Sequence, residues 1–443
     1  MTIVLIIMVF VVIIMLLGVP VGFSFGLGGF AILFITGLDP RFAIPSAFRN
    51  LESYTLLALP LFIMAGGLMR DADISKRLIA FTMSFLGRIK GGLGMVCVVS
   101  CTIFGAISGS ASAAIAAIGS VVIPEMVEQG YDRGYSTGLV AASSMLALLI
   151  PPSIPMIVFA MTAQISILAA FLSTLIPGIL MMTAYCIINL ILSRKMEKVK
   201  VAPRQNLSKT IGEIGRSTRH AGFALFMPIL VLGGIYGGIF TPTEAAGMSA
   251  LYAVIVGFLL YRTMSFKGMS LNIKNSMITS GVVMILLFFI LMVSRIMVTY
   301  QVPQQLTTLI FKFTTNKWLV LLMLNIILLL MGMLVDDVSG NILSAALLLP
   351  IAKSVGIDPV HFAAISVTNL SLGNITPPCA PMLYLAGLIG GNLPLNEYVK
   401  PASYFMIFGA LPVILLVTYV PEFALVLVNL FLRSRISIGI RLR

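Results

Sequence analysis

The sequence predicts an all-α, polytopic membrane protein built from two related halves in opposite orientations. Three observations support this fold class. Of the 443 residues, 59% are hydrophobic and only 10% are charged, whereas an ordinary soluble domain has about 25% charged residues. Apolar stretches long enough to cross a bilayer, which takes about 20 residues, recur along the chain. Two further apolar regions carry matched interruptions, so each half is expected to hold a re-entrant helical hairpin and a broken helix.

Uninterrupted apolar segments predict the spanning helices. They cover residues 3–19, 20–38, 51–70, 167–193, 221–240, 243–261, 277–300 and 404–432. The segments 71–90 and 301–317 carry mixed charge at roughly helical spacing. They are either arms lying flat at the membrane interface or ordinary loops.

The first interrupted region covers residues 91–163. Its hairpin, 91–124, is interrupted by the sequence SGSAS at Ser108–Ser112, and its helix, 134–163, is broken by PPSIP at Pro151–Pro155. Three prolines within five residues remove three amide donors, so the helix must open there.

The second interrupted region, residues 318–391, repeats this plan. Its hairpin, 318–355, is interrupted by DDVSGN at Asp336–Asn341, and its helix, 360–391, is broken by GNITPPCAP at Gly373–Pro381. The two regions match without a gap at an offset of 226 residues, which predicts an internal repeat. The matched pairs are Pro124 with Pro350, Gly130 with Gly356, Asp132 with Asp358, Pro151 with Pro377, Pro152 with Pro378, Pro155 with Pro381, and Met156 with Met382.

The distribution of basic residues predicts the orientation. The net charge is +13, but the Lys and Arg residues lie in loops between apolar spans and no base-stacking motif accompanies them, so nucleic acid is not an expected partner. If both hairpins are re-entrant, one side of the membrane collects 18 Lys and Arg and the other only five, apart from four arginines after Leu432. The side with 18 is expected to be the cytoplasm, and the repeats are then inverted.

Non-helical backbone at membrane depth is tolerated only where protein, water or a ligand supplies hydrogen-bond partners. The four breaks therefore predict two oxygen-rich sites suited to a hard cation such as sodium, with at least two ions bound in all. The first site would use Ser108, Ser110 and Ser112 with the hydroxyls near Ser143, Ser144 and Ser153. The alternative for this region is that its small residues merely allow close helix packing.

The second predicted site contains carboxylates, which are costly in a membrane segment and are usually kept for an ion or a substrate. It would use Asp336, Asp337, Ser339 and Asn341 together with Gly373, Asn374 and Thr376. The alternative is that both aspartates lie at a wet hairpin tip and serve solubility.

Short helices expected to begin after Ser112 and Asn341 would direct their positive ends toward the centre, which favours an anionic substrate. The residues expected to contact it are Ser108, Ser110, Pro152, Asp337, Asn341 and Pro378. No catalytic constellation accompanies these features. His220 and His361 are isolated, and no ATP-binding loop is present, so energy must come from an ion gradient or a partner protein.

Five segments resemble the large membrane subunit of TRAP (tripartite ATP-independent periplasmic) transporters. They are PVGFSFG at Pro20–Gly26, LPLFIMAGG at Leu59–Gly67, GAISGSASAA at Gly105–Ala114, GGIFTPTEAA at Gly237–Ala246, and NITPP at Asn374–Pro378. The resemblance covers nearly the whole chain. It implies a multi-pass protein of the bacterial inner membrane that takes up an organic acid, such as sialic acid or a C4-dicarboxylate, with sodium.

The resemblance also implies an elevator-type carrier, in which a transport domain slides past a scaffold. The scaffold and its arms would comprise residues 1–90 and 164–317, the transport domain residues 91–163 and 318–391, and a C-terminal helix and tail residues 392–443. Two partners are implied: a small four-helix membrane subunit and a periplasmic substrate-binding protein.

Two other functions remain open at this point. A stand-alone sodium/dicarboxylate carrier of related fold would work without a binding protein. It would be favoured by Ser-Asn-Thr triplets at the hairpin tips, and neither tip contains one. An ion channel could also contain broken helices.

Overall fold

The computed structural model describes residues 2–199 and 207–437, and all regular structure there is helical. Within these ranges seven helices are long and apolar enough to cross a membrane, and two bent pairs of helices also qualify if each pair is one span. The predicted all-α polytopic fold is therefore confirmed.

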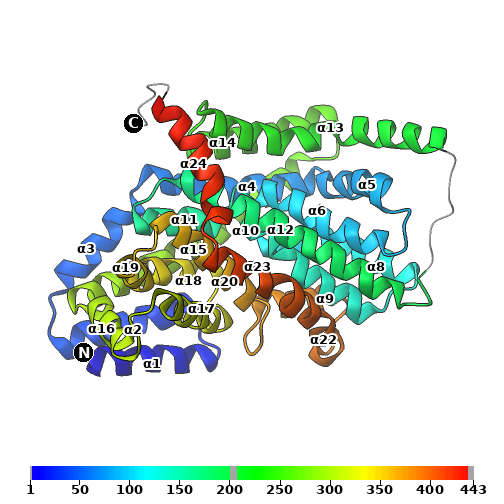
Figure 1. The fold of residues 1–443 in the computed structure, drawn as a ribbon. Helices are drawn as coiled ribbons and strands as arrows, with labels where there is room; N and C mark the ends of the chain where they lie inside the picture. Colours follow the sequence, from blue (N-terminus) through cyan, green and yellow to red (C-terminus); the bar gives the residue numbers. More distant parts are fainter. Residues whose placement is uncertain (1, 200–206, 438–443) are drawn as a thin grey trace.

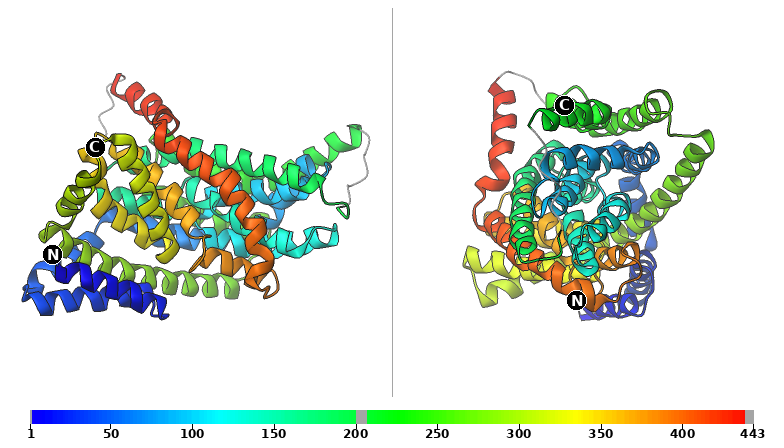
Figure 2. Two further views of the ribbon diagram at one scale, coloured as in Figure 1. Left: turned by 60° about the horizontal axis from the view of Figure 1, so that its bottom comes forward. Right: turned by 90° about the vertical axis from the view of Figure 1, so that its right-hand side faces the viewer.

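One group of helices, the outer helices, packs around α4 and α15. Helix α4 contacts α14 and α15, and α15 also contacts α2 and α3. Figure 1 shows α13 and α14 on one side of the molecule and α1 and α2 on the other, and the long α15 packs beside α2 (Figure 2). The outer helices are α1 (Thr2–Leu16), α2 (Val21–Thr36), α3 (Pro40–Leu51), α4 (Ala58–Asp71), α13 (Leu207–Gly237), α14 (Pro242–Ile255) and α15 (Phe266–Thr299).

The inner helices form the two repeats. In the first, α6 (Gly92–Ser108) and a returning arm make the hairpin. The arm is α7 (Ala111–Ala114), the π-helical turn Ile115–Gly119 and α8 (Ser120–Glu128). The broken helix follows as α9 (Arg133–Ser144), α10 (Leu146–Leu149) and α11 (Ile154–Ala163).

The second repeat has the same order of elements. Its hairpin consists of α17 (Lys317–Leu334), α18 (Asp337–Leu343), the π-helical turn Ser344–Leu348 and α19 (Leu349–Ser354). Its broken helix consists of α20 (Pro359–Gly373) and α21 (Pro381–Ile389).

Corresponding helix starts in the two repeats are capped by corresponding residues. Ser110 caps α7 and Asp336 caps α18, while Asp132 caps α9 and Asp358 caps α20. Each pair is separated by the offset of 226 found in the sequence. The internal repeat is therefore present in the local structure.

The two repeats interlock. Helix α11, which follows the first break, packs against α18 of the second hairpin, and α21, which follows the second break, packs against the π-helical turn of the first hairpin. Each repeat thus completes the core of the other.

The remaining helices connect or flank these two groups. The segments 71–90 and 301–317 contain α5 (Ile74–Leu86) and α16 (Val302–Phe313), so the alternative that they are ordinary loops is wrong. The other flanking helices are α12 (Ile167–Arg194), α22 (Leu395–Phe405), α23 (Leu411–Tyr419) and α24 (Glu422–Ser437).

Several predicted helix boundaries are wrong. Helices α13 and α15 begin at Leu207 and Phe266, well before residues 221 and 277, because their first turns are polar and resemble loops in the sequence. The predicted span 404–432 is two helices, since Pro421 lacks an amide donor and separates α23 from α24. Helix α3 was not predicted. The basic residues at 200, 204, 441 and 443 lie outside the described residues.

Candidate functional site

The tip of the first hairpin lies against the break of its own repeat. Helix α6 ends because Gly109 adopts a left-handed conformation, with a φ of 60°. A Cβ atom at Gly109 would stand 2.4 Å from the Pro152 carbonyl oxygen. The Ile154 amide donates to the Gly109 carbonyl over 3.4 Å. The proline-rich break thus supports the hairpin tip directly.

The tip of the second hairpin is organised by Asp336. Its carboxylate accepts hydrogen bonds from the Val338 amide at 3.1 Å, from the Ser339 amide at 3.2 Å, and from the Ser339 hydroxyl. The arm helices begin at Ala111 and Asp337, so the prediction that they begin after Ser112 and Asn341 is wrong. Because Asp336 already satisfies the start of α18, this helix end is not free to hold a substrate carboxylate.

Both hairpin tips line one cavity of about 510 Å³, which we call the central cavity. This volume is typical of a site for a small organic ligand. Five of the predicted site residues line it, namely Ser108, Ser110, Ser112, Asp336 and Asp337. Met382 and Leu385 of α21 contribute apolar surface. Residues 228 positions apart in the chain, such as Ser108 and Asp336, are therefore brought to one place.

The other predicted residues of the first repeat lie behind the cavity. Pro152 is buried against Gly109. The buried Ser144 hydroxyl donates to the Ala141 carbonyl at 2.7 Å. Ser143 and Ser153 are fully buried, and neither hydroxyl has a hydrogen-bond partner among the described residues.

Two predicted residues of the second repeat hold its helices together. Asn341 is buried, donates to the Asp337 carbonyl at 2.7 Å and accepts from Ser366 of α20 at 3.5 Å. Gly373 packs so closely on Gly332 that a Cβ atom would lie 2.4 Å from it. These residues fix α18 and α17 against α20.

The break of the second repeat contains three more predicted residues. The Thr376 hydroxyl donates to the Leu372 carbonyl at 2.7 Å. Pro378 is exposed and lies outside the central cavity. Asn374 is buried, and neither polar atom of its side chain has a partner among the described residues. Its carbonyl accepts from the amide of the cavity-lining Met382 at 3.2 Å.

Buried polar atoms without a hydrogen-bond partner among the described residues therefore occur at the tips and breaks. At these places they belong to Ser108, Ser143 and Ser153 in the first repeat and to Asn374 in the second, and further ones occur elsewhere, as at Thr137 and Ser280. Leaving such an atom buried and unpaired costs about 1–3 kcal/mol, so a bound ion or water is expected nearby. Oxygen atoms of this kind suit sodium, and no group of three His, Cys, Asp or Glu side chains that could hold another metal occurs in the described ranges.

The opposite wall of the central cavity comes from the outer helices and was not predicted. Helix α4 contributes Arg70, and α15 contributes Asn272, Asn275, Ser276 and Thr279. The α15 residues are spaced three and four apart, so they share one helix face. This polar stripe was a detectable signal. The predicted span 277–300 leaves Asn272, Asn275 and Ser276 outside the helix, so the prediction does not place them on one face.

A larger cavity, of about 1,070 Å³, lies at another level of α15. Leu287 and Leu291 of α15, the loop Gly237–Glu244 and the turn between α11 and α12 line it. On α15, Val283 of the central cavity and Leu287 of this second cavity are four residues apart, or about 6 Å of helix.

The comparisons with known proteins agree on one family. The sequence model of the DctM component of the tripartite ATP-independent periplasmic transporter matches residues 7–423. The chain is 34% identical to the C4-dicarboxylate TRAP transporter large permease protein DctM of Pseudomonas aeruginosa, over 92% of this chain and 94% of that protein. It is 33% identical to the sialic acid large permease protein SiaM of Vibrio cholerae, over 94% of this chain and 96% of that protein.

A third relative is longer. The chain is 35% identical to the isethionate TRAP transporter permease protein DctMQ of Oleidesulfovibrio alaskensis, over 92% of this chain but only 63% of that protein. Among solved structures, the YdaH transporter of Alcanivorax borkumensis, described as having an unusual topology, has a similar fold. Its TM-score is 0.62 at 14% identity, with 88% of this chain and 91% of that chain covered. With a family model spanning most of its length and a polytopic helical fold, this chain belongs to the DctM component family of tripartite ATP-independent periplasmic transporters.

Proposed function

We propose that this protein takes up an organic acid together with sodium across the bacterial inner membrane, and that the inner helices move past the outer helices during transport. The observation that carries the proposal is the central cavity, where two hairpin tips from inverted repeats face one wall of outer helices. A site formed at a repeat interface by discontinuous helices is the usual arrangement in secondary transporters.

Sodium coupling rests on the oxygen atoms around the breaks. Asp336 and Asp337 are the acidic residues that line the central cavity, and the unpaired oxygen atoms of Ser108 and Asn374 lie on the two repeats. A carboxylic acid substrate entering a cavity that holds two acidic side chains would be repelled unless cations entered with it. Two or more sodium ions would remove this repulsion.

Movement between inner and outer helices rests on the position of the two cavities. Both cavities lie between α4 or α15 on one side and inner helices on the other, at successive levels of α15. Small residues at this contact, such as Gly66 against Ser108, leave little side-chain interdigitation to resist sliding. In this proposal residues 91–163 and 318–391 carry the substrate, and residues 1–90 and 164–317 stay fixed.

The proposed partners and substrate class are inferred from the names of the relatives. Those relatives are named as permeases for C4-dicarboxylates, sialic acid and isethionate, all of which carry an acidic group. We assign to this chain an acid of this kind, a small membrane subunit and a periplasmic binding protein that delivers the acid.

Transport by reconstituted vesicles tests the proposal. The chain is reconstituted with its small subunit, and labelled succinate, N-acetylneuraminate and isethionate are supplied with and without the binding protein and a sodium gradient. Uptake that requires both sodium and the binding protein is the expected result. Uptake with sodium alone would indicate a stand-alone carrier, and current without stoichiometric uptake of the acid would indicate a channel.

A further inference from the structure

Among the described residues, Arg70 is the only basic one that lines the central cavity. It lies in the last turn of α4, and its side chain is 49% exposed. Its Nε atom lies 3.5 Å from the carboxylate of Asp71. Its Nη atoms, which carry most of the donors of a guanidinium group, make no hydrogen bond to any described residue.

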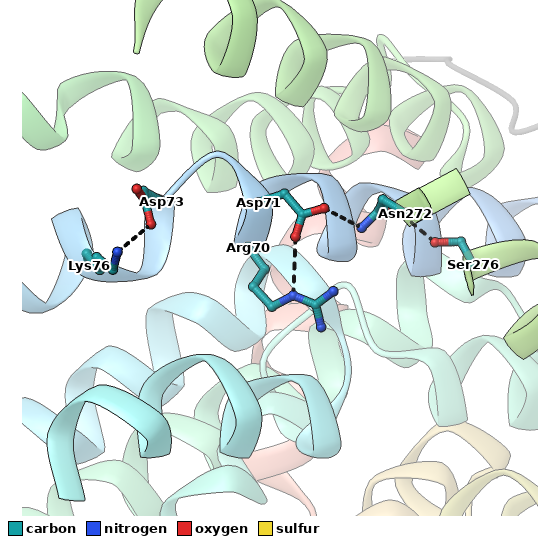
Figure 3. Close-up of polar contacts among 6 residues, drawn as sticks. All are labelled: Arg70, Asp71, Asp73, Lys76, Asn272 and Ser276. Carbon is teal, nitrogen blue, oxygen red and sulfur yellow. Dashed lines mark hydrogen bonds and ion pairs between the residues drawn. The ribbon is translucent and has the colours of Figure 1, made fainter. Parts of the chain in front are cut away.

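A chain of polar contacts fixes the base of this side chain. Asp71 also accepts from Asn272 of α15 at 3.2 Å, and Asn272 accepts from Ser276 at 3.3 Å. Figure 3 shows Asp71 between Arg70 and Asn272. Asn272 packs onto Gly67 so closely that a Cβ atom there would be 2.4 Å from its amide nitrogen. The contact therefore holds α4 and α15 together and positions Arg70 without using its Nη donors.

Polar residues of α15 form part of the wall that contains Arg70. Asn275 and Thr279 of α15 line the same cavity, and neither is apolar as a lipid-facing residue would be. Across the cavity stand Asp336 and Asp337, so the acidic side chains outnumber the basic one. The guanidinium of Arg70 belongs to the outer helices, which stay fixed in the proposed function. It could therefore bind the acidic substrate as the substrate leaves the hairpin tips.

We propose that Arg70 binds the acidic group of the substrate when the central cavity is open to the side of the membrane rich in Lys and Arg. The two free Nη groups would donate in parallel to a carboxylate or sulfonate, a geometry for which arginine is suited and lysine is not. This inference rests on the proposed function. It adds a substrate-binding residue on the outer helices, whereas the predicted ones all lie on the inner helices.

Exchange in proteoliposomes isolates this step. The experiment uses whichever acid of the panel named above the wild type transports. The labelled acid is supplied outside the vesicles, bound to the binding protein, and the concentration of unlabelled acid inside the vesicles is varied. Since the binding protein acts only from outside, only transporters in the native orientation contribute. The internal concentration that gives half-maximal exchange then reports affinity at the inner face.

Arg70→Gln is expected to raise this internal half-saturating concentration about tenfold or more, because a charge-assisted hydrogen bond is lost. Arg70→Lys, which keeps the charge but not the parallel donors, is expected to raise it about threefold. The sodium dependence should stay unchanged in both variants, which separates lost substrate binding from general damage to the site. Lys76→Gln is the matched control. It removes a basic residue six positions away that pairs with Asp73 and lies outside the cavity.

An unchanged internal half-saturating concentration in Arg70→Gln would overturn the inference. If that variant is not recovered folded, equal values for Arg70→Lys and the wild type would overturn it. A wild type that exchanges none of the acids in the presence of sodium and binding protein would contradict the proposed function itself, and the inference would fall with it.

Discussion

Single residues at the hairpin tips carry the chemistry proposed here. Ser108, Ser110, Ser112, Asp336 and Asp337 could be predicted from the sequence, because polar residues that interrupt an apolar segment need partners in a membrane. The polar stripe of α15 that contains Asn272 is visible in the sequence, but its place in the cavity, and that of Arg70, could not be predicted. Arg70 and Asn272 lie on helices remote in the chain, and only tertiary packing brings them to the cavity. Which of the predicted oxygen atoms bind sodium stays a prediction.

Asp336→Asn tests the sodium role of one carboxylate. Asparagine caps a helix about as well as aspartate, so α18 should keep its start while losing one negative charge. We expect the sodium concentration for half-maximal uptake to rise about tenfold, the change for one lost interaction of about 1.4 kcal/mol.

Asp358→Asn is the matched control for that variant. Asp358 is the N-cap residue of α20, as Asp336 is of α18, but it lies outside the central cavity. The Asp358→Asn protein should reach half-maximal uptake at the same sodium concentration as the wild type. Equal sodium dependence in both variants would contradict the proposed second sodium site.

At the scale of elements, the matched breaks were the most informative sequence signal. The offset of 226 predicted from prolines and glycines also relates the N-caps of the two repeats. The polar first turns of α13 and α15 were not predictable from apolar periodicity, because this signal reports only the lipid-facing part of a helix.

Gly109→Ala tests the contact between the first hairpin and its break. An alanine there would adopt an unfavourable left-handed conformation, costing about 1–2 kcal/mol, and would press on the Pro152 carbonyl. The thermal unfolding temperature in detergent should fall, and transport should fall with it.

Gly281→Ala provides the comparison. Gly281 lies within α15 with open space around its Cβ position, so alanine should leave the unfolding temperature equal or slightly raised. A Gly109→Ala protein as stable as the wild type would show that the tip does not depend on this close contact.

The interlock of the two repeats belongs to the whole molecule. Nothing in the sequence indicates that α11 packs on α18 or that α21 packs on the first hairpin, because such contacts join segments far apart in the chain. Their consequence is that the four inner parts form one unit. That unit touches α4 through the first hairpin, where Ser108 lies next to Gly66, and touches α15 through α18 of the second hairpin.

The central claim is that the inner helices move past the outer helices during transport, and a reversible cross-link tests it most directly. In a background lacking the four native cysteines, Gly66→Cys and Ser108→Cys join α4 to the hairpin tip, where the two Cβ positions are 3.1 Å apart, slightly closer than in a typical disulfide. Gly22→Cys with Leu286→Cys, at 3.5 Å, joins two outer helices as a control. Oxidation should abolish uptake only in the first pair, and reduction should restore it. Undiminished uptake by a fully cross-linked Gly66→Cys/Ser108→Cys protein would contradict the claim.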